Sequence, residues 1–149
     1  MSVRVQYEDF DVGSEIERLR AGNAKIGAVV SFIGLVRDLN DGDAVSSMTL
    51  EHYPGMTERS IAAIIDSAKA RWNIYDALVV HRVGRLLPCE QIVLVIVTSA
   101  HRADAFAACE FLMDYLKTRA PFLKKEDIPG SARWVDSRQS DDAAAARWE

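Results

Sequence analysis

GAVVSFIGLV, residues 27–36, is a dense run of apolar and β-branched side chains. Such a run, with no regular polar alternation, is typical of a strand that is buried on both faces of a sheet. A polar stretch, DLNDGD at residues 38–43, follows it, and residues 44–53 then alternate between apolar and polar side chains. We therefore expect a hairpin in which residues 44–53 pair with residues 27–36.

The elements on either side of this hairpin predict a mixed fold. Ser14 and Glu17 form a capping box, which predicts a helix that runs to about Arg20. The periodicity predicts strands at 3–7, 77–83 and 91–98, helices at 57–72, 102–118 and 141–148, and a short apolar piece at 134–135. This order lacks the regular strand-helix alternation of a doubly wound sheet, so we predict an α+β protein with residues 1–149 in one domain.

The composition excludes several classes of function. Apolar residues make up 49% of the 149 residues and charged residues 27%, which is the balance of a globular protein. A net charge of -4 argues against general nucleic-acid binding, because that function usually needs a basic domain. No apolar run approaches the roughly 18 residues that span a bilayer, and the first twenty residues do not form a signal peptide. We therefore expect a cytoplasmic protein that does not bind membranes.

The stretch MDYLKTRAPFLKKE, residues 113–126, carries the clearest indication of chemistry. It places four cations, Lys117, Arg119, Lys124 and Lys125, around a proline. A lysine ammonium that is partly desolvated beside other positive charges can lose its proton and act as a nucleophile or base. Lys117 is the best candidate because it projects beside the apolar stripe of its helix. The alternative is a solvated basic helix end that complements the helix dipole.

A second candidate site is TSAHR, residues 98–102, where a helix begins directly after a β-branched strand. Free backbone N–H groups at a helix start favour anions, and His101 and Arg102 add donors and charge. Ser99 is the expected cap of this helix. The stretch is therefore a candidate phosphate site, and a surface His and Arg without a ligand is the alternative.

These two candidate sites cannot bind one small ligand within a single chain. His101 and Lys117 are sixteen residues apart along one predicted helix, which separates them by roughly 24 Å. If both serve the same site, a second copy of the chain must contribute one of them. A two-fold dimer would allow this.

The remaining candidates are weaker. Arg37 lies where the run at 27–36 meets the polar turn, so it either faces a pocket or is an ordinary exposed arginine. His52 and His81 lack partners at metal-ligand spacing, and we interpret both as structural. No metal site is expected. Cys89 and Cys109 are too few for a disulfide framework, and Cys109 falls in an Ala-rich helical pattern that predicts a buried thiol.

Five segments together resemble the large, catalytic subunit of molybdopterin synthase. They are GAVVSFIGLVRD at 27–38, LEHYPGMTE at 50–58, HRVGRL at 81–86, VTSAHR at 97–102 and MDYLKTRAPFLKKE at 113–126. Five such segments in the right order are highly specific, and they cover most of the chain. The resemblance implies an α/β hammerhead fold with an additional antiparallel β-sheet.

The resemblance also implies an activity and an assembly. Enzymes of this family transfer two sulfurs to cyclic pyranopterin monophosphate and so form the dithiolene of molybdopterin. The sulfur comes from the thiocarboxylated Gly-Gly C-terminus of a small ubiquitin-like subunit, so no further cofactor is implied. Two large subunits form a central homodimer, and a small subunit docks at each end to give a heterotetramer.

The family's site residues map onto the candidates described above. Lys117 is implied as the principal catalytic group, acting on protons or accepting the acyl group, and Lys124 assists it. His101 and Arg102 are implied to come from the neighbouring large subunit. Leu123 departs from the family, in which many members have an aromatic residue. The implied substrate-binding residues are Leu35, Val36, Arg37, His101, Arg102, Lys117, Lys124, Lys125 and Glu126.

Two other functions stay open at the level of the sequence. A non-enzymatic module that binds a ubiquitin-like tail or another anionic ligand needs the basic pocket but no activated lysine. A pterin- or nucleotide-phosphate hydrolase that uses His101 predicts activity without any thiocarboxylated protein. The lack of a metal-ligand motif counts against the hydrolase.

Overall fold

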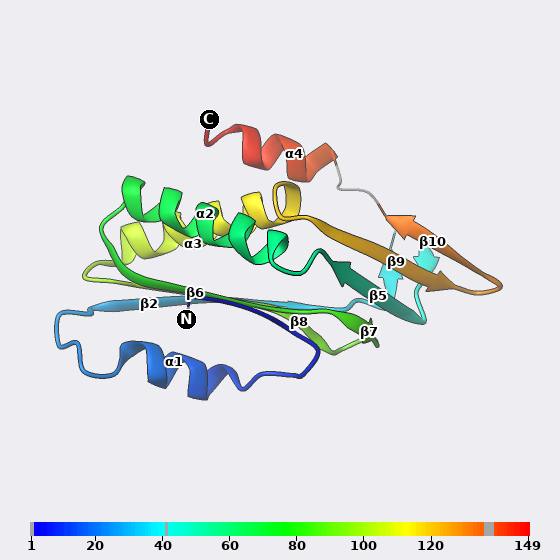
Figure 1. The fold of residues 1–149 in the computed structure, drawn as a ribbon, viewed down its shortest axis with the longest axis horizontal. Helices are drawn as coiled ribbons and strands as arrows, with labels where there is room; N and C mark the ends of the chain where they lie inside the picture. The colour runs from blue at the N-terminus through cyan, green and yellow to red at the C-terminus, as the bar shows by residue number, and fades with distance from the viewer. Residues whose placement is uncertain (1, 41, 136–138) are drawn as a thin grey trace.

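The computed structural model describes residues 2–40, 42–135 and 139–149. Helices and strands follow one another in a mixed order (Figure 1). The helices are α1 (Val12–Arg20), α2 (Met56–Arg71), α3 (Arg102–Thr118) and α4 (Gln139–Ala146). The strands are β1 (Val3–Gln6), β2 (Ala28–Leu35), β3 (Leu39–Asn40), β4 (Asp43–Ala44), β5 (Ser47–His52), β6 (Ile74–Arg82), β7 (Gly84–Leu86), β8 (Gln91–Ser99), β9 (Phe122–Ile128) and β10 (Ser131–Val135).

The main sheet has four strands in the order β1-β6-β8-β2. β1 pairs with β6 in parallel, and the other two pairings are antiparallel. Helices α2 and α3 cover one face of this sheet and α1 covers the other, while α4 packs on the outer side of α3 (Figure 1). The sheet is therefore the middle layer of three.

The central strand β8 contributes apolar side chains to the hydrophobic cores on both faces of the main sheet. Its odd-numbered residues, such as Val95 and Val97, belong to the core under α2 and α3, whereas Leu94 and Ile96 belong to the core against α1. Because successive side chains of a strand point to opposite faces, an unbroken apolar run is what such a position requires. β8 is thus a strand that is buried on both faces.

The prediction that residues 27–36 form such a strand is wrong in one respect. β2 is indeed a strand, but among the described strands it lies at the edge of the main sheet, where it pairs with β8. Phe32 and Leu35 on it are 40% and 52% exposed. An apolar run shows that a segment favours a strand, but it does not show whether a second strand or a helix covers it.

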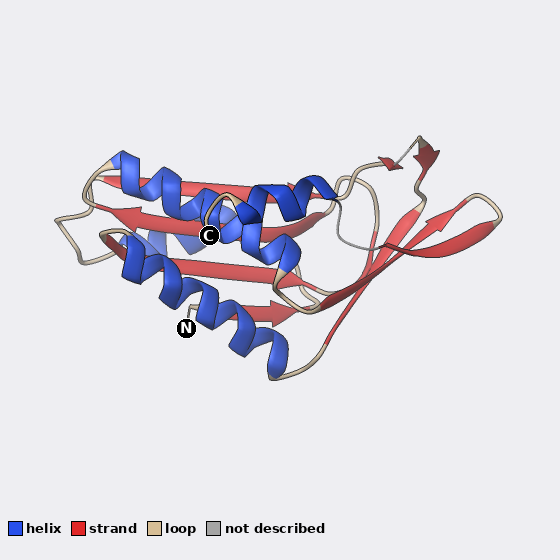
Figure 2. Ribbon diagram, turned by 90° about the horizontal axis from the view of Figure 1, so that it is seen from above, coloured by secondary structure: helices blue, strands red, loops and turns tan. Residues whose placement is uncertain are grey.

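The predicted hairpin between 27–36 and 44–53 is also wrong. β5 lies in a second, antiparallel sheet with the order β10-β9-β5-β7, which extends from one end of the main sheet (Figure 2). Its partner β9 comes from the region after α3, and this strand at residues 122–128 was not predicted as a separate element. The α+β class and the additional antiparallel sheet that the resemblance implied are confirmed.

Several local predictions can be compared directly with the structure. The helix at 102–118 is confirmed residue for residue, and Cys109 within it is buried, with a pKa that burial raises to about 11. The predicted cap of the first helix is wrong, because Asp11 accepts the backbone N–H of Ser14 and the helix begins at Val12. Among the described residues, no helix is both long and apolar enough to cross a membrane.

The entry into β2 gives a testable prediction. The Gly27 backbone N–H donates to the Ser99 carbonyl oxygen at 3.0 Å, and a Cβ added at Gly27 meets the Ala100 carbonyl oxygen at 2.3 Å. Because a backbone atom cannot move aside easily, we expect Gly27→Ala to lower the free energy of unfolding by about 1–3 kcal/mol. Urea denaturation measures this change.

Gly13→Ala is the matched control for this substitution. Gly13 lies in helix α1, where an added Cβ meets nothing closer than the Asp11 carboxylate oxygen at 3.5 Å. Alanine favours the helix over glycine, so this variant should be as stable as the parent or more stable by up to about 1 kcal/mol. Equal stability of the two variants would contradict the close approach at Gly27.

Candidate active site

Two adjoining cavities of about 240 and 320 Å³ lie where the end of α3 meets the second sheet. Both are lined by Lys117 of α3, Lys124 of β9 and Asp141 of α4, with Met48 and Ile92 as shared apolar walls. We call these two cavities together the cationic cavity. It joins residues from the middle of the chain to residues near its C-terminus.

Only two of the four cations grouped in the sequence line the cationic cavity. Lys117 and Lys124 line it, whereas Arg119 pairs with Glu149 and packs over the Tyr115 ring on another side of α3. Lys125 is exposed and does not line it. Side chains that are two residues apart on a helix point in different directions, and so do neighbouring side chains on a strand. Proximity in sequence therefore does not bring all four cations together.

The turn after β2 contributes the third cation, Arg37. Val36 anchors this turn, because its backbone N–H donates to Glu90 and its carbonyl accepts from Cys89, both at 2.9 Å. The Val36 side chain is 6% exposed and belongs to the core beneath the second sheet. Leu35, Val36 and Arg37 all line the smaller cavity, as the family resemblance implied.

Glu126 lines the same cavity, but its carboxylate is already held by protein groups. It is 3% exposed, and both of its oxygens accept from the Asn40 side-chain amide at 2.9 Å. The Arg133 guanidinium lies 3.3 Å from the carboxylate, and the Lys124 ammonium lies 3.9 Å from it. The carboxylate therefore balances two cations and fixes β9 and β10 against β3, which contains Asn40.

His101 and Arg102 lie at the opposite end of α3 from Lys117. α3 is one continuous helix from Arg102 to Thr118, and both residues at its start are exposed. His101 occupies the N-cap position without a side-chain cap, so the prediction that Ser99 caps the helix is wrong. The Ser99 hydroxyl donates to the Asn73 carbonyl at 2.7 Å and accepts the backbone N–H of His101 at 3.4 Å. Within the described part of one chain, the structure does not bring the two candidate clusters together.

The sequence did not indicate two titratable residues that line the cationic cavity. Asp141 comes from α4, whose place beside α3 is set by Trp148, which packs against Trp72 and Phe111. His81, which we interpreted as structural, lines the larger cavity together with Lys117. His81 begins the segment HRVGRL at 81–86, but that segment does not indicate a cavity residue, and no motif contains Asp141, because each residue reaches the cavity only through tertiary packing.

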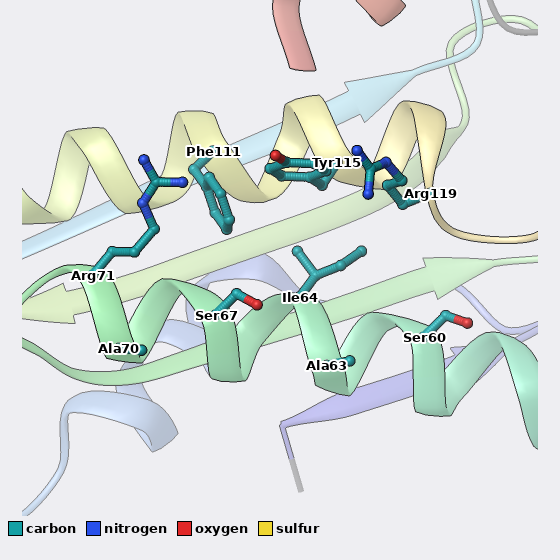
Figure 3. A pocket seen from close by; sticks show the side chains of 9 residues that line it. All are labelled: Ser60, Ala63, Ile64, Ser67, Ala70, Arg71, Phe111, Tyr115 and Arg119. Carbon is teal, nitrogen blue, oxygen red and sulfur yellow. The ribbon is translucent and has the colours of Figure 1, made fainter. Parts of the chain in front are cut away.

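A larger groove of about 620 Å³ lies elsewhere, between α2 and α3 (Figure 3). Phe111 and Tyr115 line its α3 side, and Arg71 and Arg119 lie near its ends. Arg71 donates to the Trp148 carbonyl and Arg119 pairs with Glu149, so neither arginine lacks a partner. This groove shares no residue with the cationic cavity, and we do not assign the chemistry to it.

The fold and the cationic cavity define a three-layer α+β protein with a lysine-lined cavity between a helix end and an antiparallel sheet. The family described as "MoaE protein" matches residues 5–119. A relative from Ralstonia nicotianae, named molybdopterin synthase catalytic subunit, is 63% identical over 147 residues, which cover 99% of this chain and 84% of that protein. The chain belongs to the family of molybdopterin synthase catalytic subunits.

Solved structures agree with this assignment. The molybdopterin biosynthesis MoaE protein from Burkholderia ambifaria is 57% identical, with a TM-score of 0.85 over 99% of this chain and 97% of that one. A chain from a complex of subunits 1 and 2 of the molybdopterin-converting factor from Helicobacter pylori is 17% identical, with a TM-score of 0.75 over 93% and 92% of the two chains. At that identity, the likeness shows the fold alone.

The buried carboxylate of Glu126 gives a second prediction. Glu126→Ala removes the carboxylate that accepts from the Asn40 amide and lies beside Arg133 and Lys124. We expect the free energy of unfolding to fall by about 2–4 kcal/mol, allowing for the partial exposure of Arg133. Lys125→Ala, one residue away on the exposed face of β9, should change it by less than about 0.5 kcal/mol. Similar losses in the two variants would show that Glu126 does not have this role.

Proposed function

We propose that this chain transfers sulfur to a phosphorylated pterin and that the cationic cavity is where the reaction takes place. The substrate is cyclic pyranopterin monophosphate, and the product carries the dithiolene of molybdopterin. The sulfur is supplied by a small ubiquitin-like subunit whose Gly-Gly C-terminus is a thiocarboxylate. The chain needs no cofactor of its own for this reaction, and we place it in the cytoplasm.

The observation that carries this proposal is the convergence of Arg37, Lys117 and Lys124 on one cavity of a chain whose net charge is -4. Concentrating cations locally in an acidic protein favours an anionic ligand at that place. The phosphate of the pterin and the thiocarboxylate of the tail are both anions, so the same cavity suits both. The relative named a catalytic subunit supports the proposal that this chain also works with a further subunit.

The chemistry requires a bond to sulfur to form and another to break. In each transfer the thiocarboxylate sulfur bonds to a carbon of the pterin, and the oxygen that this carbon carried leaves, either as water or by opening the cyclic phosphate ester. The bond between the sulfur and the carbonyl carbon of the tail is then cleaved. Water takes the acyl group directly, or the Lys117 amine takes it first and water releases it later, so that the tail leaves as a carboxylate. In either case Lys117 lies beside the reacting atoms and Lys124 assists it.

A second copy of the chain completes the site in this proposal. His101 and Arg102 lie one helix length from Lys117, so they bind the phosphate only in the cationic cavity of a neighbouring chain. Two such chains form the central homodimer, and a small subunit docks at each end. Leu35, Val36 and Arg37 contact the substrate from within the same chain as Lys117. Lys125 and Glu126, which the resemblance also implied, act through the strand that carries Lys124.

The third prediction separates this enzyme from a pure binding module. Lys117→Ala should lower the rate of dithiolene formation from cyclic pyranopterin monophosphate by at least about a hundredfold, because it removes the reacting amine. Binding of the small subunit should change by less than about threefold. The assay mixes the purified chain with thiocarboxylated small subunit and follows the product by mass spectrometry.

Arg119→Ala is the matched control, since Arg119 follows Lys117 by two residues but lies outside the cationic cavity. It should retain the parent rate. A Lys117→Ala variant that turns over at the parent rate would rule out the catalytic role of Lys117. Hydrolysis of the pterin phosphate ester by the parent chain, in the absence of any thiocarboxylated protein, would instead support the hydrolase alternative.

A further inference from the structure

His81 occupies a position on the main sheet that points toward the cationic cavity. It lies on β6, two and four residues after Val79 and Ala77, which face the core beneath α2 and α3. Because side chains of a strand alternate, His81 belongs to this same face. It comes at the end of the strand, where the core gives way to the cationic cavity, and it lines that cavity together with Lys117 and Lys124.

The hydrogen bond at Nδ1 determines the tautomer of this imidazole. Nδ1 lies 2.8 Å from the Arg82 carbonyl oxygen. A carbonyl oxygen can only accept, so Nδ1 carries the proton and donates it. In the neutral ring the lone pair is then on Nε2, and Nε2 makes no hydrogen bond to any described residue.

The ring is held in place and kept neutral. It stacks on Phe122 of β9, with ring centroids 4.0 Å apart and an angle of 22° between the planes. Burial is the main reason that the pKa of His81 is lowered to about 4; the hydrogen bond to the Arg82 carbonyl opposes this shift, and the proximity of Lys117 and His52 adds to it. At neutral pH, therefore, His81 adds no positive charge to the cavity.

We propose that His81 is a positioning residue for the sulfur-transfer reaction: its neutral Nε2, which has no described hydrogen-bond partner in this structure, accepts a hydrogen bond from the Lys117 amine when that amine turns toward the reacting atoms, and so orients it within the cationic cavity. This inference rests on the proposed function of Lys117. A flexible four-carbon side chain at an exposed helix end has many rotamers, and one fixed acceptor reduces them. No covalent bond to His81 forms or breaks.

Titratable side chains from the surrounding elements lie near the His81 ring. Lys117 approaches from α3, Lys124 from β9, His52 from β5 and Asp141 from α4. A protonated His81 would repel both lysines, whereas a neutral acceptor favours the ammonium form of the amine that it binds. The arrangement thus makes the imidazole an acceptor rather than a third cation.

The experiment compares three variants of the full chain. His81→Asn places an amide near Nδ1, so it retains a donor to the Arg82 carbonyl but has nothing at Nε2. His81→Gln places an amide oxygen near the Nε2 position, and His81→Phe retains only the stacking on Phe122. We measure the pKa of Lys117 by NMR of ¹³C-labelled lysine, and the Lys117→Arg variant identifies its resonance. We also measure the single-turnover rate of sulfur transfer with the thiocarboxylated small subunit.

We expect the Lys117 pKa to fall by at least about half a unit in His81→Asn and His81→Phe, because the hydrogen bond that favours the ammonium is lost. The transfer rate should fall roughly tenfold in both variants, since the amine is less well placed. His81→Gln should recover most of both quantities. An unchanged pKa in folded His81→Asn, or a His81→Gln no better than His81→Asn, would overturn the proposal.

Two further readouts keep the proposal testable if a variant does not fold or the reaction is not seen. ¹⁵N NMR of the imidazoles in the parent protein should show His81 neutral and protonated at Nδ1 from pH 6 to 8, and an Nε2-protonated ring would contradict the assignment. A parent chain that transfers no sulfur refutes the proposed function. The Lys117 titration still decides, in that case, whether His81 contacts the amine.

Discussion

The packing of α3 across the main sheet is the contact on which the rest of the structure depends. Ala105, Ala108 and Leu112 are fully buried against the sheet, so the helix is fixed along its length as one rigid rod. Its end places Lys117 beside the second sheet, and its start places His101 and Arg102 one helix length away. The same packing that stabilises the fold therefore divides the candidate binding residues between two ends.

Gathering cations at one end of this rod is unfavourable unless anions balance them. Within the chain, the buried Glu126 carboxylate lies between Lys124 and Arg133, and Asp141 reaches the cavity from α4. Protein carboxylates thus stabilise the cationic cavity, and in the proposed reaction the phosphate and the thiocarboxylate add to that balance. The imidazole of His81 fits this arrangement because it is kept neutral and adds no charge.

The sequence predicted those features that depend on local pattern. The boundaries of α3, the buried Cys109 and the α+β class follow from periodicity and composition, and the five motifs indicated the family. The edge position of β2 and the pairing of β5 with β9 depend on contacts between distant segments. Lys124 and Lys125 diverge because side chains alternate along β9, a strand that the sequence did not indicate. His81 could not be identified from its neighbours, because its place beside Lys117 arises only when β6 and α3 pack together.

In the proposed assembly one active site contains residues from two chains, and a mixture of two inactive variants tests this most directly. A Lys117→Ala chain and a chain with both His101→Ala and Arg102→Ala should each be nearly inactive alone. After unfolding and refolding together, mixed dimers have one site with all residues intact, so about a quarter of the parent sulfur-transfer activity should return for a random mixture, in which half of the dimers are mixed. Activity of the mixture no greater than the average of the two variants would contradict a shared site.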